Sequence, residues 1–137
     1  MTLYNIVEKL KNIAITKPNI NYVGEGDIYD LNSLPNIDYG VFYITQSNHS
    51  QSQDTTTYNL TLYYIDRIFQ DKSNTLNVQS TGIQVLTTIV NTFEYSTDVI
   101  VNYDMDYTTF THKFSDLCAG VYCNLSISVD NELGICE

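Results

Sequence analysis

Nucleophilic catalysis requires a thiol or hydroxyl beside a general base, and the chain has two histidines and three cysteines for that chemistry. His49 lies in a stretch of polar residues, which predicts a solvated imidazole. His112 lies in the β-like run Thr111–Phe114, where a histidine is expected to sit on a strand surface. A catalytic site would have to bring His112 to Asp or Cys residues that are distant in sequence. The sequence therefore predicts no catalytic residue and no enzymatic activity.

The cysteines fit a packing role better than a metal-binding one. Cys118 and Cys123 differ in strand parity, so they are expected on opposite faces of a sheet, with Cys123 as a small core residue. Their spacing lacks the two-residue gap of zinc sites, and Cys136 follows without a fourth ligand beside it. An odd number of cysteines in a chain without a signal sequence favours reduced thiols in a cytosol.

Two other patterns resemble ligand-binding loops but lack essential residues. Asp98, Asp104 and Asp106 are spaced carboxylates of the kind that bind calcium, yet the glycine and glutamate of a calcium loop are missing. The run from Gly24 to Asp27 has neither a buried strand before it nor a lysine after it, which favours a loop bend over a phosphate site. The sequence predicts no metal site and no cofactor.

Composition limits the class of protein further. A chain of 137 residues predicts a single domain, residues 1–137. A net charge of -10, from 6 basic and 16 acidic residues, repels phosphate and argues against sequence-specific nucleic-acid binding. The first ten residues lack the basic start and apolar run of a signal peptide, and no window approaches the about 18 apolar residues of a membrane span. We expect synthesis in the cytoplasm and no membrane partner.

Hydrophobic periodicity predicts the elements of the N-terminal part. Apolar residues at helical spacing predict a helix over Leu3–Ile13, with Thr2 as its N-cap and an end before Pro18. Glycine, proline and Asx residues predict a loop over Asn19–Asp38, with one short turn at Ile28–Leu31.

Two strands and a loop are predicted next. β-branched and aromatic residues predict a strand over Tyr39–Thr45, and alternation predicts an antiparallel partner over Thr55–Asp66. Between them, Gln46–Asp54 has no apolar side chain and predicts a long, mobile hairpin loop. Tyr63 and Tyr64 should place one ring on each face, one of them in an aromatic pair or a subunit contact.

The remaining elements complete an α+β fold. A turn with a capping group over Asp71–Asn74 leads into a helix over Leu76–Phe93, the clearest helix of the chain. Its apolar residues are predicted to fall on one side, and they are Leu76, Ile83, Leu86, Val90 and Phe93. β segments are predicted over Val99–Tyr103 and Tyr107–Phe114, and an alternating strand over Val121–Val129. The order helix, two strands, helix, two or three strands predicts an antiparallel or mixed sheet with two helices packed on it.

Three patterns together resemble the tail-terminator and tail-completion proteins of bacteriophage necks. They are the strand Tyr58–Arg67 running into the long helix, the short N-terminal helix before an extended loop, and the closing segment Phe114–Val129 with its Gly-Val step. The abundance of Asn, Ile and Tyr with little Arg is similar to proteins of phages that infect Bacteroides-type gut bacteria, including the crAss-like group.

This resemblance implies a homo-oligomeric ring, a hexamer or dodecamer, at the head–tail junction of a virion. Its partners would be further copies of the chain, adjacent neck, portal or tail proteins, and viral DNA that passes without sequence-specific binding. A ring subunit needs two different, complementary flanks, and the segment Gln46–Asp54 is expected to project into the channel or onto a neighbouring ring. The family has no catalytic residues.

Two other functions fit the same sequence. The chain could be a different virion assembly subunit, such as a tail-tube or head-completion protein, or a small acidic intracellular binding module that occupies a basic partner. Twelve tyrosines and five phenylalanines exceed what one core of this size can bury, so some of these rings are expected in an interface.

Overall fold

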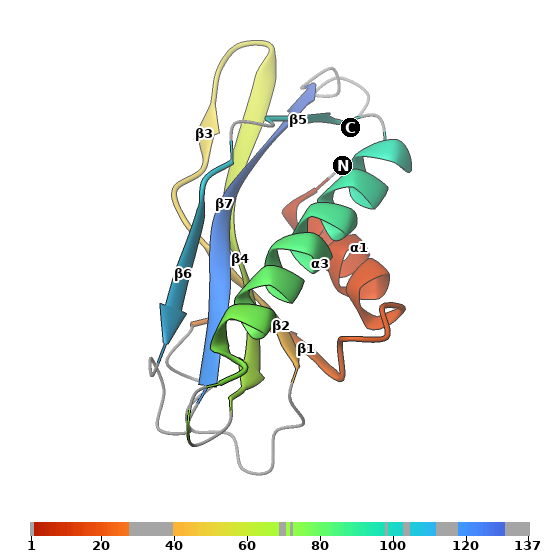
Figure 1. The fold of residues 1–137 in the computed structure, drawn as a ribbon. Coiled ribbons are helices and arrows are strands. Elements are labelled where there is room, and N and C mark those ends of the chain that lie inside the picture. Colours follow the sequence, from red (N-terminus) through yellow and green to blue (C-terminus); the bar gives the residue numbers. More distant parts are fainter. Residues whose placement is uncertain are drawn as a thin grey trace.

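The computed structural model describes residues 2–27, 40–68, 71, 73–97, 99–102, 105–111 and 118–130. Within these residues, two helices cover one face of a seven-stranded mixed sheet, which confirms the predicted α+β class (Figure 1). The elements are α1 (Leu3–Ile15), β1 (Tyr22–Glu25), β2 (Val41–Gln46), β3 (Ser50–Gln51), β4 (Thr55–Arg67), α3 (Thr75–Tyr95), β5 (Ile100–Val101), β6 (Tyr107–Thr111) and β7 (Cys118–Asp130).

The N-terminal helix forms as its sequence predicts. Thr2 is the N-cap, and its Oγ1 accepts a hydrogen bond from the Asn5 amide at 3.2 Å. The apolar stripe is the buried face of α1, and Thr16 forms the C-cap before Pro18. The helix thus docks its apolar side on the sheet and leaves its polar side to solvent.

The long helix α3 also forms, with one error in its predicted face. Leu76 is 77% exposed, because it lies in the first turn and off the line of buried side chains that continues through Val78, Leu86 and Phe93. Asp71 makes the predicted turn, since its Oδ1 accepts from the Ser73 amide at 3.0 Å. Asn74 occupies the N-cap position without a side-chain capping bond to the helix.

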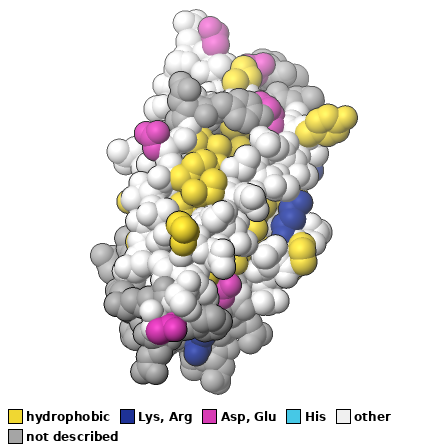
Figure 2. Space-filling model, in the orientation of Figure 1, with side chains coloured by type: hydrophobic (Ala, Val, Ile, Leu, Met, Phe, Trp, Pro, Cys, Tyr) yellow, Lys and Arg dark blue, Asp and Glu magenta, His cyan; other side chains and the backbone are white. Residues whose placement is uncertain are grey.

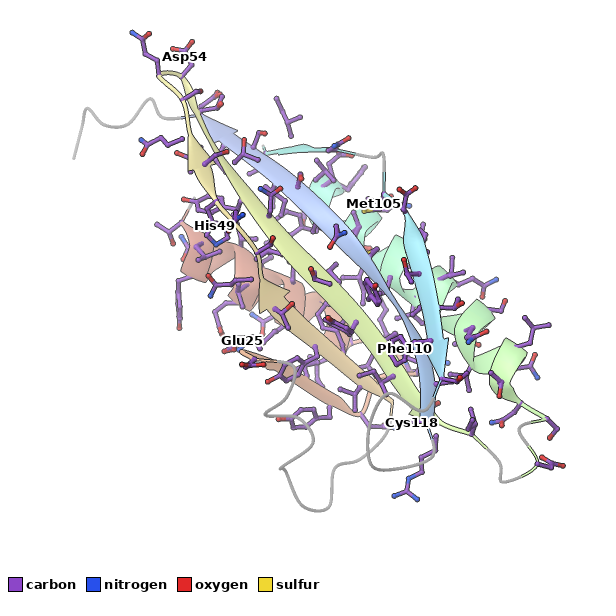
Figure 3. The ribbon with its side chains drawn as sticks, turned by 90° about the vertical axis from the view of Figure 1, so that its left-hand side faces the viewer. Glu25, His49, Asp54, Met105, Phe110 and Cys118 are labelled. Carbon is purple, nitrogen blue, oxygen red and sulfur yellow. The ribbon has the colours of Figure 1, made fainter. Side chains whose placement is uncertain are left out.

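The sheet is built around β4 and β7, which pair antiparallel over all thirteen residues of each. Five strands lie side by side at one end, in the order β1-β2-β4-β7-β6, and we call this the broad end. Four strands lie side by side at the other, in the order β3-β4-β7-β5, and we call this the narrow end. Figure 3 views the sheet from the face opposite the helices, which we call the far face.

Close packing between α3 and the sheet depends on Gly82 and on Tyr64. A Cβ at Gly82 would lie 2.5 Å from Val121 Cγ1 and 2.9 Å from Tyr64 Cδ2, so only glycine allows this approach. The Tyr64 ring is buried between helix and sheet, and its hydroxyl donates to Asp66 Oδ2 at 3.3 Å. Burial, together with the Asp66 carboxylate, raises the pKa of the Tyr64 hydroxyl.

Two short strands lie where loops were predicted, and those predictions were wrong. β1 falls within Asn19–Asp38, because four residues interrupted by glycine are too few to show a strand period. β3 falls within Gln46–Asp54, where polar, exposed residues are held by backbone pairing to β4 and not by burial. The predicted turn at Ile28–Leu31 lies outside the described residues.

The other strands agree with prediction apart from their ends. β2 runs antiparallel to β4 as expected and extends to Gln46. β7 begins at Cys118, three residues before the alternation becomes visible at Val121. None of the described helices has the length and apolar character needed to cross a membrane.

Candidate functional site

His49 is exposed, as predicted, but it is anchored to its neighbours. The Asn59 amide donates to its Nδ1 at 3.2 Å, and its Nε2 lies 3.1 Å from Gln46 Oε1. A backbone N–H can only donate, so Nδ1 must be unprotonated and Nε2 carries the proton of a neutral imidazole. The ring also meets Tyr58 edge-on, with 5.5 Å between centroids. These contacts hold the segment that precedes β3 against strand β4.

The two described thiols are inert packing groups. Cys118 belongs to an apolar cluster on the far face and Cys123 to the core beneath the helices, which confirms their predicted opposite orientation. Both side chains are fully buried. Burial raises the pKa of the Cys123 thiol to about 12, so it is protonated at neutral pH and unsuited to nucleophilic attack.

The described residues contain no group of three or more His, Cys, Asp or Glu side chains that could hold a metal ion. Gly24 and Glu25 belong to β1, and Gly26 ends the strand with a φ of 134°, a conformation that favours glycine. His112, Asp98, Asp104 and Cys136 lie outside the described residues, whereas Asp106 is exposed before β6.

A groove of about 530 Å³ follows the outer side of α1 and reaches Thr92 of α3. Its charged lining residues are Glu8 and Lys9, and the remainder are Asn, Thr and Ile. Glu8 is already paired with Lys11, whose Nζ lies 2.8 Å from Glu8 Oε2. The groove lining contains no imidazole and no thiol.

At the broad end, the far face carries a belt of aromatic and aliphatic side chains that spans the sheet. Tyr63 lies at the centre of this belt, 5.3 Å from the Tyr122 ring and 6.5 Å from the Phe110 ring, measured between centroids. The prediction that Tyr63 and Tyr64 occupy opposite faces is thus confirmed. The belt consists of Tyr22, Val41, Tyr43, Tyr63, Ile65, Phe110, Cys118 and Tyr122.

At the narrow end, the same face carries hydroxyl and amide side chains instead. Three successive pairs of directly opposed residues on β4 and β7 are each joined by a side-chain hydrogen bond. They are Thr57 with Ser128 at 3.3 Å, Ser126 donating to Asn59, and Thr61 donating to Asn124 at 2.9 Å. These polar pairs satisfy one another, so β4 and β7 are joined at this end by uncharged hydrogen-bonding side chains.

Among the strands that the structure describes, β1 forms one lateral edge of the broad end. The amides of Tyr22 and Gly26 donate inward to Gly40 and Ile44 of the neighbouring segment, at 3.3 and 3.0 Å. By alternation the amide of Val23 points away from the sheet. Glu25 is the charged residue of β1, and Lys11 lies 3.2 Å from its Oε1. This edge therefore combines an outward backbone amide with an exposed carboxylate that shares the Lys11 ammonium with Glu8.

Strand β6 forms the opposite edge of the broad end, and it pairs with β7 on its inner side. Its sequence, Tyr-Thr-Thr-Phe-Thr, has no charge and no proline. Gln79 of α3 donates its side-chain amide to the Phe110 carbonyl at 3.3 Å, which fixes the strand against the helix. Alternate backbone groups of such a strand face outward, the arrangement that accepts another strand.

The two edges are far apart in the molecule. Glu25 on β1 and Phe110 on β6 lie on opposite lateral sides of the sheet in Figure 3. On the face shown in Figure 2, most side chains are uncharged, acidic groups are scattered, and Lys and Arg are sparse. This face is therefore better suited to protein contact than to phosphate binding.

Comparison of the chain with known protein families found no match. Comparison with curated proteins found no match either.

Only one of the two edge strands was predicted from the sequence. β6 was predicted as part of Tyr107–Phe114, but β1 was not, although Tyr22 and Val23 are residues that favour strands. The usable signal was this aromatic and β-branched pair, placed between the turn residues Pro18 and Gly24.

Proposed function

We propose that this chain is a structural subunit of a bacteriophage particle, forming a ring at the head–tail junction through which viral DNA passes. The observation that carries the proposal is the pair of edge strands, β1 and β6, on opposite sides of one sheet. Edges without free charge or proline are disposed to pair with another chain. Two different edges on opposite sides of a subunit allow the head-to-tail contact from which closed rings are built.

The charge of the chain suits a channel for DNA. With 16 acidic and 6 basic residues, the subunits repel phosphate, so DNA would slide along the wall without being held. Lys11, one of the few cations, is engaged by Glu8 and Glu25. A ring of such subunits acts through its geometry and needs neither cofactor nor catalytic residue.

The arm formed by β3 and the start of β4 suits contact with neighbouring proteins of the particle. Asp54 lies at its tip, at the narrow end, and the arm extends past the ends of both helices (Figures 1 and 3). The turn is closed by Ser52, whose amide donates to the Thr55 carbonyl at 2.8 Å. We assign this arm to contacts with the adjacent neck, portal or tail protein, or to the channel.

Electron microscopy tests the proposal. The purified chain, at high concentration and at ionic strength high enough to screen its acidic groups, should form closed rings of uniform diameter. Antibody against the chain should label phage particles at the head–tail junction, and antibody against a capsid protein provides the positional control. Absence of the chain from every particle would contradict the proposal.

Two different results would instead support the other functions. Labelling along the whole tail, with stacked rings from the purified chain, would identify a tail-tube subunit. A chain that stays monomeric and binds a basic protein with salt-sensitive affinity would identify an acidic binding module.

A further inference from the structure

The two edge strands of the broad end lie at the same level of the sheet. The pairing registers form continuous rows across all five strands. One row contains Tyr22, Val41, Ile65, Gly120 and Phe110, and a row three residues away contains Glu25, Ile44, Leu62, Cys123 and Tyr107. A residue of β1 can therefore be assigned a counterpart on β6 at equal height.

The edges also run in opposite directions. β1 is parallel to β2, β2 is antiparallel to β4, and β4 is antiparallel to β7, so β1 runs parallel to β7. β6 runs antiparallel to β7 and hence antiparallel to β1. If a second copy lies beside the first without being turned over, β6 of one meets β1 of the next as an antiparallel pair, the more favourable arrangement.

Side chains on these edges match as well. Tyr22 and Phe110 share a row and both pack against the aromatic belt of the far face. Placed side by side, they form an aromatic cross-strand pair that continues the belt from one copy into the next. Glu25 would face Tyr107, and because β6 carries no charged residue, no like charges oppose one another in the ladder.

We infer that β6 of one copy adds to β1 of the next as an antiparallel strand, in the register that places Phe110 opposite Tyr22 and Thr109 opposite Val23. This interface rests on the proposed function and names the partner surface for it, a second copy of this chain. The outward amide of Val23 supplies one of its hydrogen bonds.

The shape of the sheet limits the contact to the broad end. Five strands are present there and four at the narrow end. Among the described strands, copies that join at β1 and β6 therefore leave a space about one strand wide, roughly 4.8 Å, between β3 and β5 of neighbouring copies. The arms remain free at the narrow end, where they can contact other proteins.

Disulfide cross-linking tests the register directly. Val23→Cys and Thr109→Cys chains are mixed in a Cys136→Ser background, which retains the buried Cys118 and Cys123. Directly opposed residues approach closely enough for a disulfide, whereas diagonal neighbours are too far apart. Mild oxidation should convert most of this mixture to a covalent dimer on a non-reducing gel.

Thr111→Cys is the matched control, because it lies on the same strand and the same face, two residues further along. Its mixture with Val23→Cys should give several-fold less dimer than the Thr109→Cys mixture. Electron microscopy of the same samples tests the ring separately from the β6–β1 interface. Rings without the Val23–Thr109 cross-link, or with equal cross-linking at Thr111, would overturn the interface while leaving the ring intact. A chain that never associates would overturn both.

Discussion

The two ends of the far face differ in chemistry although the same two strands run through both. Along β4, Tyr63 in the aromatic belt is followed on the same face by Thr61, and along β7 Tyr122 is followed by Asn124. The broad end is held by packing of aromatic rings, and the narrow end by hydrogen bonds between paired polar side chains. The same two paired strands are therefore stabilised in two different ways, and the residue types at each end determine which way applies.

This difference in chemistry suits the two ends to different roles. Burial of apolar surface contributes most of the free energy of folding, so the broad end should dominate stability. Hydrogen-bonded polar pairs contribute less, because water competes for the same groups. The narrow end can therefore carry an exposed arm, while the broad end carries the rigid edges that we assign to assembly.

The largest expected effect comes from Gly120 at the broad end. A Cβ at this position would lie 2.0 Å from the Tyr64 carbonyl oxygen and 2.9 Å from Phe110 Cζ. Gly120→Ala should therefore lower the free energy of unfolding by about 3 kcal/mol or more, measured by urea denaturation. Ser128→Ala at the narrow end is the control and should cost about 1 kcal/mol. Equal losses of unfolding free energy in the two variants would contradict the conclusion that the broad end dominates stability.

A matched pair on one strand comes next. Tyr63 is 9% exposed within the belt, whereas Thr61, two residues away on the same face, makes one hydrogen bond to Asn124. Tyr63→Ala should cost about 3 kcal/mol through lost packing, and Thr61→Ala about 1 kcal/mol. The measurement is again urea unfolding, with circular dichroism to verify the fold. If Thr61→Ala cost as much as Tyr63→Ala, hydrogen bonding and not packing would dominate this face.

Alkaline pH should weaken the broad end through Cys123. Burial raises the pKa of this thiol from 9.0 to about 12, so unfolding releases its proton at any pH between these values. The stability contribution is complete below pH 9 and is lost as pH rises toward 12, by about 2 kcal/mol at pH 10.5.

Cys123→Ala removes this part of the pH dependence. The slope that remains above pH 10 belongs to other groups, among them Tyr64, whose pKa is also raised by burial. Unfolding free energies of both proteins at pH 8 and 10.5 provide the measurement. An identical slope in the two proteins would show that the thiol is not the titrating group.

The smallest effect is expected at the arm of the narrow end. His49→Ala removes the acceptor of the Asn59 amide, so hydrogen exchange of that amide should accelerate several-fold, with a loss of about 0.5 kcal/mol in global stability. Ser50→Ala should leave this amide unchanged. Loss of protection at Tyr63 as well would contradict a local role for His49.

The sequence predicted those elements whose buried residues recur at the spacing of a helix or of a strand. The apolar stripe of α1 and the alternation along β4 and β7 record one buried face each, and these elements were found. β1 and β3 are held by backbone pairing, which leaves no mark on residue type, and they were missed.

The candidate interface could be predicted only in part. An excess of aromatic residues indicated that some rings lie outside the core, and Tyr63 does lie on the far face. The equal level and opposite direction of β1 and β6 follow from pairings between segments far apart in the chain. No local pattern encodes such a relation, so Tyr22 and Phe110 could not be matched in advance.

Molar mass in solution tests the central claim most directly, by light scattering on size-exclusion fractions over a range of concentration and salt. The wild-type chain should reach one discrete multiple of its 15.6 kDa subunit mass. Val23→Pro, which removes the outward amide of β1, should remain at the subunit mass, while Val23→Ala, which keeps this amide, should assemble. A wild-type chain that stays at 15.6 kDa under all conditions, or a proline variant that assembles equally well, would contradict the account.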